Sequence, residues 1–355
     1  MLVQAMIIFY NQSEGCEHMK PLNGIHHVTA ITSSAEKIYD FFTHILGLRL
    51  VKKTINQDDI HTYHLFFADD QGNAGTDITF FDFPNSSPAQ KGSDEISKTS
   101  FRVPNDQALV YWKKRFEHYQ IKHYPIITMF GMKTLEFRDF DNQEYVLVSD
   151  EHDKGIKPGI PWQKGPIPLE YAIYGLGPIF FRVSDPRRMD DVLTQYLTFN
   201  KTDEENAFTR YQTGQGGNGA SVIVETRKDR ALGYQGYGSI HHVAFSVDGD
   251  QDIHDWMDHL DTIGARHSGY VDRFYFHSLY TRLYPSMLFE FATDGPGFID
   301  DEESYEILGE TLALPPRFRS MRHKIEQLVR PIDTKRSDKV YNKEYMNKVG
   351  ETHET

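Results

Sequence analysis

The chain of 355 residues is 39% hydrophobic, 25% charged and 13% aromatic, a composition typical of a soluble globular protein with one large core or two medium ones. Its formal net charge of −13 opposes contact with phosphate backbones, so we expect no nucleic-acid partner. No stretch approaches the roughly 18 consecutive apolar residues of a membrane helix, so we expect no membrane segment. The negative net charge therefore indicates a solvated, acidic surface and little else.

Cys16 is the only cysteine, which excludes a disulfide framework and a thiolate metal cluster and fits a reducing cytoplasm. Residues 1–18 begin with an apolar run but lack the basic region and cleavage site of a signal peptide. Met19-Lys20-Pro21 resembles a second start, directly before the first patterned segment. We therefore expect residues 1–20 to be an N-terminal extension that folds poorly or not at all, and we expect no function for Cys16.

The first patterned unit combines one helix with several strands. Residues 25–32 alternate like a strand, and the next segment has the apolar spacing of a helix. Ser33 and Glu36 predict a capping box at the start of this helix, and Gly47 predicts its end. Strand-like runs then follow at residues 48–55, 63–69 and 77–83.

The second unit repeats this pattern. It has a strand at residues 98–103, a helix with an apolar face, and a last strand at residues 144–150. A polar stretch rich in glycine and proline comes next, and we interpret residues 152–172 as a linker between two domains.

Two further units follow the linker. The third begins with a strand at residues 178–183, and Asp185 with Pro186 predicts a helix start of N-cap and first-turn proline. The fourth begins with a strand at residues 239–247, and its helix ends at Gly264.

Units rich in strands with one helix each predict an α+β protein. The tail holds one predicted amphipathic helix over residues 314–329, and its last 20 residues are polar, so we expect them to be disordered. The predicted domains are residues 21–151 and 173–304, each with two units, followed by the tail at 305–355.

A histidine doublet recurs at the same place in two units. Residues 25–28 read Ile-His-His-Val, and residues 240–243 repeat them. Because alternate residues of a strand share a face, His242 shares its face with small residues, and His27 shares its face with Thr29. Small neighbours leave room for a ligand beside each histidine.

Glu290 lies in the middle of an apolar strand, where a carboxylate is costly to bury unless it is paired or binds a metal. Two imidazoles and one carboxylate form the facial triad of non-haem Fe(II) oxygenases, so His27, His242 and Glu290 are the candidate ligands. A structural ion pair between Glu290 and Arg273 or Arg282 is the alternative. We expect no function for six other histidines, which occupy helix faces or polar stretches: His44, His61, His64, His118, His254 and His259.

The segments GIHHVTAITSSAEKIYDFFTHILGLRLVKKTINQDD, YHLFFADDQGNAGTDITFFDFP, SIHHVAFSV and LFEFATDGPGF carry a family resemblance. Over roughly residues 22–325 the chain resembles the vicinal oxygen chelate superfamily, which includes glyoxalase I, bleomycin-resistance proteins and extradiol dioxygenases. Within it, the chain is most similar to the hydroquinone-type ring-cleaving dioxygenases. The resemblance implies four βαβββ modules in two paired domains with cupped mixed sheets. It also implies Fe(II), with Mn(II) as the other option, held by His27, His242 and Glu290.

The resemblance further implies an aromatic diol and O2 as substrates. Arg273 and Tyr280 would hold the far hydroxyl of the diol or stabilise developing negative charge. His241 is the candidate acid by analogy with related extradiol enzymes, since histidine titrates near neutrality. His26 would support the ligands or touch substrate, although strand alternation places it off the face of His27. Thr29 is expected to line the pocket.

Two other functions stay open on the same fold. A glyoxalase-type isomerase or lyase would need a second strand glutamate, but the counterpart of Glu290 in the first unit falls near Phe80 and Phe81. A quinone- or drug-binding protein would need no metal. The glycine-rich run at 214–219 has no helix after it, so we interpret it as a hairpin loop and not a phosphate site. Paired-module folds often associate, which leaves a homo-oligomer open.

Overall fold

The computed structural model describes residues 19–300 and 302–346. Cys16 and nearly all of the predicted N-terminal extension lie outside this range, so the predictions for them are not tested. No helix among the described residues is long and apolar enough to cross a membrane.

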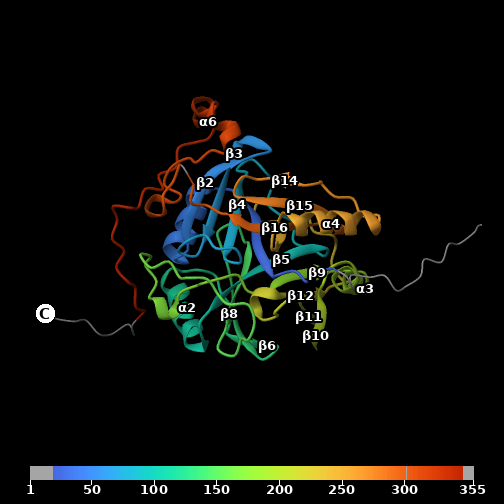
Figure 1. Cartoon of the computed structure of the whole chain (residues 1–355). Helices are drawn as coiled ribbons and strands as arrows, with labels where there is room; N and C mark the ends of the chain where they lie inside the picture. The colour runs from blue at the N-terminus through green and yellow to red at the C-terminus, as the bar shows by residue number, and fades with distance from the viewer. Residues whose placement is uncertain (1–18, 301, 347–355) are drawn as a thin grey trace, which may run out of the picture.

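The strands form two eight-stranded mixed sheets, each built from two βαβββ units (Figure 1). The first sheet has the order β14-β15-β16-β13-β1-β4-β3-β2. Its strands are β1 (Ile25–Thr32), β2 (Arg49–Asn56), β3 (Asp59–Ala68), β4 (Asp77–Asp82), β13 (Ser239–Val247), β14 (Val271–Asp272), β15 (Phe276–Tyr284) and β16 (Met287–Pro296). The helices of these two units are α1 (Ala35–Asp40) with the π-helical turn η2 (Phe41–Ile45), and α4 (Asp250–Thr262).

The second sheet has the order β10-β11-β12-β9-β5-β8-β7-β6. Its strands are β5 (Glu95–Val103), β6 (Ile127–Met129), β7 (Met132–Arg138), β8 (Glu144–Ser149), β9 (Ile179–Val183), β10 (Asn200–Glu205), β11 (Phe208–Gln212) and β12 (Ser221–Thr226). Its helices are α2 (Asp106–His118) and α3 (Pro186–Asp191), the latter continued by the π-helical turn η4 (Val192–Tyr196).

The α+β class with four βαβββ modules is confirmed, and the sheets combine these modules across the chain. In Figure 1 the blue strands of the first unit lie beside the orange strands of the last, and the green strands of the middle units form the other sheet. Each sheet therefore draws on both predicted domains, 21–151 and 173–304. A site in the first sheet needs the first and last units together.

The main hydrophobic core fills the space between the sheets and their helices. It includes the buried aromatic side chains of Phe42, Phe101, Trp112 and Trp256. A separate apolar cluster lies on the other face of the first sheet and includes Phe66 and aromatic residues of the last unit. Each face of this sheet therefore has its own apolar layer, and the second layer surrounds the candidate site.

The helix boundaries test three predictions. Asp185 accepts a hydrogen bond from the Arg188 amide as the N-cap of α3, and Gly264 follows α4 with a φ of +70°, as expected. The predicted capping box of the first helix is wrong by one residue. Ser34 is the N-cap, because Ser33 instead donates its hydroxyl to Asp141 Oδ1 at 2.5 Å, a contact with the second unit.

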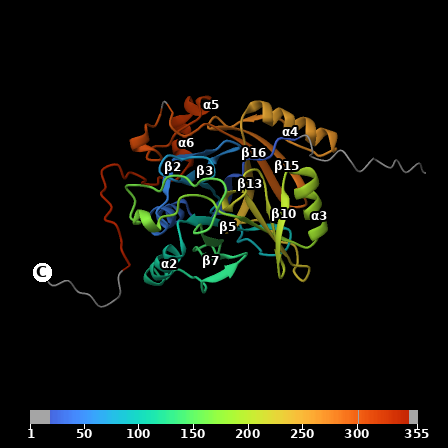
Figure 2. The same cartoon turned by 60° about the horizontal axis from the view of Figure 1, so that its bottom comes forward.

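The tail runs along the outside of the first unit in both views (Figures 1 and 2). It contains two short helices, α5 (Pro316–Arg319) and α6 (Arg322–Leu328), where one was predicted. The break follows from tertiary contacts, because Glu302 pairs with Arg319 and Arg322 on either side of it, at 3.1 and 2.8 Å.

The predicted disorder of the last 20 residues is wrong for residues 336–346. Arg336 is buried and donates to the carbonyl of Leu50 at 2.6 Å. The fully buried Arg115 guanidinium pairs with Glu344 at 2.6 Å. The buried side chains of Arg336 in this segment and of Arg115 in the body therefore hold a segment that is too polar to fold by hydrophobic burial alone.

Candidate metal centre

Three side chains from three adjacent strands converge at one point of the first sheet. His27 on β1, His242 on β13 and Glu290 on β16 are all buried, and their ligand atoms lie within 4.8 Å of one another. Glu290 Oε2 lies 3.1 Å from His27 Nε2 and 2.9 Å from His242 Nε2, and the two Nε2 atoms are 3.4 Å apart. The structure thus brings together the three predicted ligands.

The strand registers explain this convergence. β1 and β13 are antiparallel neighbours, with His27 opposite Ala244 and His242 opposite Thr29. Each strand has one extra residue in this ladder, and it is the first histidine of each doublet, His26 in β1 and His241 in β13. A β-bulge lets two successive side chains point toward the same region, which strict alternation would forbid. The repeated doublet is therefore the sequence signature of two matching bulges.

The bulge at His26 sets the tautomer of His27. His26 Nε2 lies 3.0 Å from the carbonyl oxygen of Thr293, which can only accept, so this nitrogen carries a hydrogen. Burial, followed by the neighbouring His27, lowers the pKa of His26 to about 3, so His26 is neutral and its Nδ1 is an acceptor. His27 Nδ1 lies 2.9 Å away and must donate to it. The free lone pair of His27 is then on Nε2, which faces Glu290.

His241 stands in the same relation to His242. Their Nδ1 atoms are 2.7 Å apart, and burial lowers the pKa of both rings, that of His241 to about 3. With Nε2 of His242 as a ligand atom, its Nδ1–H donates to His241 and leaves a hydrogen on His241 Nε2. A ligand histidine commonly donates its other N–H in this way, which orients the ring.

Glu290 supplies the test of whether these residues fit a cation. Both of its carboxylate oxygens are fully buried, and neither accepts a hydrogen bond within residues 19–300 and 302–346. Burial acts to raise the pKa of Glu290, but the imidazoles of His27 and His242 outweigh it and hold that pKa well below its usual range. A buried carboxylate without hydrogen-bond donors, beside two imidazole lone pairs, is costly unless a cation joins the group. The donor set of two nitrogens and one oxygen fits a divalent transition metal.

A cavity of about 300 Å³ opens beside the triad, in the size range of small-molecule sites. Aromatic and apolar side chains make up much of its wall: Phe66, Phe81, Phe83, Tyr275, Phe276, Tyr280 and Leu288. Polar lining groups include His64, His241, Arg273 and Asp58. The cavity therefore combines flat apolar walls with a few polar groups, as a site for a small aromatic molecule requires.

Arg273 and Tyr280 lie together in this wall. Arg273 Nε donates to Tyr280 Oη at 3.2 Å, and its two terminal nitrogens contact the exposed Asp58 carboxylate at 3.1 and 3.3 Å. Asp58 belongs to the turn between β2 and β3, so this contact joins the first and last units. The Arg273 side chain thus extends from the inner Tyr280 to the cavity's exposed edge.

Thr29 and His64 differ from expectation. Thr29 is fully buried behind the cavity lining, where its hydroxyl lies 2.8 Å from that of Thr79. His64, for which no function was predicted, lines the cavity with its Nε2 2.8 Å from Thr79 Oγ1. Burial, followed by the nearby His27, His242 and Arg273, holds the pKa of His64 well below its usual range. The signal in the sequence was weak, because only alternation with Phe66 places His64 on the inner face of β3.

In the second sheet, an ion-pair cluster lies where its two units meet. Arg182 on β9 pairs with Glu95, Glu225 and Glu144 at 2.6, 2.8 and 3.5 Å. Within the described ranges, only the first sheet has three such ligands close enough for one metal ion. The middle units therefore support the fold, while the first and last units form the site.

Comparison with known proteins agrees with this arrangement. A family model of the Glyoxalase/Bleomycin resistance protein/Dioxygenase superfamily matches residues 24–147. The Bacillus subtilis protein named "Putative ring-cleaving dioxygenase MhqA" is 41% identical over 316 residues, which cover 88% of this chain and 99% of that relative. The chain belongs to this ring-cleaving dioxygenase family.

Other members and structures extend the comparison. The "Chlorohydroquinone/hydroquinone 1,2-dioxygenase" of Sphingobium indicum is 28% identical, with 86% of this chain and 95% of that protein covered. A crystal structure of a Bacillus subtilis dioxygenase family member is 33% identical with a TM-score of 0.82, and covers 89% of this chain and 99% of that one. Glyoxalase I from Zea mays shares the fold, with a TM-score of 0.52 at 11% identity over 76% of this chain and 91% of that one. Family membership and the His-His-Glu group together indicate a metal-dependent dioxygenase.

Proposed function

We propose that this protein is an Fe(II)-dependent dioxygenase that cleaves the ring of a hydroquinone or a related aromatic diol, with His27, His242 and Glu290 as the metal ligands. The observation that carries the proposal is Glu290, a buried carboxylate that lacks hydrogen-bond donors and faces two imidazole nitrogens beside an aromatic-lined cavity. Two histidines and one carboxylate leave open coordination positions for substrates, which is the arrangement of non-haem iron oxygenases. Mn(II) is the alternative metal for the same donor set.

When bound, the metal supplies a Lewis acid that orients the diol and O2 next to each other. Side chains of the protein bind and orient the substrate. Phe66, Phe81 and Phe276 form apolar walls that hold an aromatic ring and exclude water. Arg273 and Tyr280 present hydrogen-bond donors to a second oxygen of the diol or to negative charge on it.

His241 has the position required of a hydrogen-bond donor to the ligand, whereas the predicted role as an acid would require a protonated ring, which burial opposes by lowering its pKa. It lines the cavity, and the contact of its Nδ1 with His242 leaves the hydrogen on Nε2, the nitrogen available to a ligand. His26 has a supporting role in this proposal, because it lies outside the cavity lining and holds His27 through Nδ1. In each doublet the second histidine is the proposed metal ligand and the first histidine orients it, and His241 can also donate a hydrogen bond to the substrate.

The register of the first unit disfavours a glyoxalase-type isomerase. Thr29 pairs with Thr79 on β4 as Ala244 pairs with Glu290 on β16, so Thr79 is the counterpart of Glu290. This is one residue from the predicted position near Phe80, and it provides no second carboxylate. A metal-free binding protein is also disfavoured, because it would bury both oxygens of the Glu290 carboxylate without a hydrogen-bond donor.

The test is to load the protein anaerobically with Fe(II) and to follow O2 uptake with hydroquinone, methylhydroquinone and catechol, with Mn(II) in parallel. We expect O2 uptake with at least one para-diol and a ring-opened product. Glu290→Ala should lose the metal, while His61→Ala, at an exposed position of β3, should retain it. If the iron-loaded protein takes up no O2 with any diol, the proposed function falls. Full iron retention by Glu290→Ala would remove Glu290 from the ligands.

We further propose a cytoplasmic location, supported by the single cysteine. A homo-oligomer is the remaining proposal on partners, and it rests only on the tendency of paired-module folds to associate.

A further inference from the structure

Behind the cavity wall, three side chains from adjacent strands form a continuous chain of hydrogen bonds. Thr29 on β1 and Thr79 on β4 are paired residues of the ladder, and their hydroxyl oxygens are 2.8 Å apart. Thr79 Oγ1 lies 2.8 Å from Nε2 of His64, on the neighbouring strand β3. Both threonines are fully buried, so neither hydroxyl exchanges its partner with water.

The number of hydroxyl hydrogens decides in which direction the hydrogen bonds of this series run. If Thr29 donates to Thr79 and Thr79 donates to His64 Nε2, both buried hydroxyl hydrogens have an acceptor. In the reverse direction His64 donates from Nε2, Thr79 donates to Thr29, and the Thr29 hydrogen has no acceptor in the part of the chain that the structure describes. Because a buried donor without a partner is costly, the first direction is favoured. It places the remaining ring hydrogen of His64 on Nδ1.

The ring of His64 is also fixed in space. Its centroid lies 4.0 Å from that of Phe66 and 4.5 Å from that of Phe81, the two aromatic residues beside it in the cavity wall. Nδ1 has no hydrogen-bond partner among residues 19–300 and 302–346, although His64 lines the cavity. A donor that is fixed in the cavity wall and has no protein acceptor is available to an acceptor on a bound ligand.

We propose that His64 donates a hydrogen bond from Nδ1 to an oxygen of the bound diol, and that Thr79 is the positioning residue that holds His64 in this tautomer. The inference rests on the proposed function for the identity of the ligand as a diol. It makes His64 a residue that discriminates a ring oxygen from a hydrogen or a methyl group at the same place. A protonated His64 would also carry a hydrogen on Nδ1, so the inference does not depend on a pKa.

The tautomer can be measured without turnover. Long-range ¹⁵N–¹H spectra of histidine-labelled protein loaded with Zn(II), which is diamagnetic, distinguish a hydrogen on Nδ1 from one on Nε2. The His64 signal is assigned by its loss in His64→Asn. We expect the Nδ1–H form in the unaltered protein, and a shift toward the other tautomer in Thr79→Val. Thr99→Val is the matched control, because Thr99 is likewise a buried strand threonine but lies in the second sheet. An Nε2–H form in the unaltered protein would overturn the inference.

The contact with the diol is tested by two amide variants. His64→Asn places an amide near the position of Nδ1 and can keep the donor, whereas His64→Gln places it near Nε2 and cannot. For anaerobic binding of hydroquinone to the Zn(II)-loaded protein, we expect His64→Gln to weaken binding about tenfold, the effect of one lost hydrogen bond. His64→Asn should bind within about threefold of the unaltered protein, and so should the exposed control His61→Asn.

Metal content and thermal unfolding of each variant show that the site and the fold are intact. Equal binding by His64→Gln and the unaltered protein would overturn the inference and leave the proposed function unaffected. Absence of hydroquinone binding by the unaltered protein would also overturn it. Absence of O2 uptake by the iron-loaded protein, with weakened binding by His64→Gln, would instead overturn the proposed function alone.

Discussion

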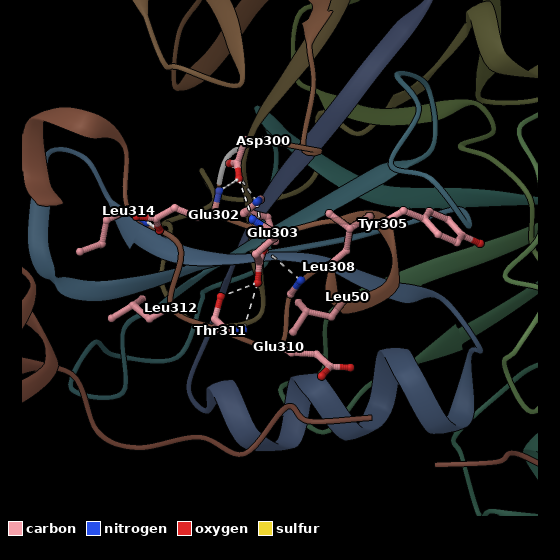
Figure 3. Close-up of polar contacts among 12 residues, drawn as sticks. Leu50, Asp300, Glu302, Glu303, Tyr305, Leu308, Glu310, Thr311, Leu312 and Leu314 are labelled. Carbon is pink, nitrogen blue, oxygen red and sulfur yellow. Dashed lines mark hydrogen bonds and ion pairs between the residues drawn. The ribbon is translucent and has the colours of Figure 1, made fainter. Parts of the chain in front are cut away.

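Lys52 on β2 and Glu303 in the segment after β16 form an ion pair with 2.9 Å between Nζ and Oε2, and neither side chain is exposed. Glu303 also accepts from the backbone of Gly309 and from the amide and hydroxyl of Thr311, which fold the segment around the carboxylate (Figure 3). Lys52 Nζ lies 5.3 Å from the ring centroid of Tyr275, which lines the cavity. The ion pair therefore connects the tail to the wall of the candidate site.

Replacing Lys52 by Met should destabilise the protein strongly. The change leaves the Glu303 carboxylate buried without its cation, and breaking a buried pair on one side costs about 3–5 kcal/mol. Urea unfolding measures the change in the free energy of unfolding. Lys335→Met is the control, because its pair with Asp338 is exposed to solvent and should contribute little to stability. Equal effects of the two substitutions would contradict the structural role of Lys52.

His26→Ala should weaken metal binding about 10- to 100-fold without removing a ligand. The reason is that His26 Nδ1 accepts the hydrogen of His27 Nδ1, which holds the Nε2 lone pair toward the metal position. Competition with a coloured chelator measures the affinity, and His61→Ala provides the comparison for loss of an exposed imidazole. An unchanged affinity would show that His26 does not orient His27.

If the proposed function is right, Arg273→Met should lower kcat/KM for the diol about 100-fold or more, with metal content unchanged, because it removes a cationic hydrogen-bond donor from the cavity wall. O2 uptake per bound metal measures the effect. Asp58→Asn separates the two functions of this arginine, because it weakens only the exposed pair at the edge of the cavity. We expect less than about a threefold change from Asp58→Asn. A similar loss in both variants would assign Arg273 to joining the two units and not to substrate.

Stability should depend on pH through Asp139, which follows β7. Burial raises the pKa of its carboxyl to about 7 in the folded protein, against an ordinary value of 3.8, although Tyr145 donates to it at 2.8 Å. A raised folded-state pKa contributes stability that is complete below pH 3.8 and lost as the pH rises through 7. Asp139→Asn does not titrate, so its stability relative to the unaltered protein should rise between about pH 5 and pH 8, by on the order of 3 kcal/mol. Urea unfolding across this range tests the trend, with Thr99→Val, which changes no titratable group, expected to give a constant difference.

Local sequence patterns predicted the units and the triad. Alternation and helix spacing are properties of short segments, so β1, β13 and the start of α3 could be found without the rest of the fold. The doublets at residues 26–27 and 241–242 were informative because the same pair recurs at matching positions of two units. Glu290 was identified by a different argument, the cost of burying a carboxylate in an apolar strand.

Contacts between distant strands decided the rest. The sequence did not show that the first unit pairs with the last. Strict alternation misplaced His26, because it takes no account of the β-bulge at this residue. It also placed Thr29 in the cavity and gave His64 no function, because only the register of β1, β4 and β3 aligns Thr29, Thr79 and His64. The composition of the tail predicted disorder where buried Arg115 and Arg336 hold it.

The sequence by itself therefore determined most of the secondary structure, the modules and the three candidate ligand residues of this protein, since each depends on residues close in the chain or on a repeat. Only the tertiary structure decided which modules share a sheet, how each ligand histidine is oriented and which side chains surround the cavity. The physical reason is that a one-residue change in strand register moves a side chain to the opposite face. Register is set by long-range pairing of strands and by bulges, and neither is encoded by any single segment.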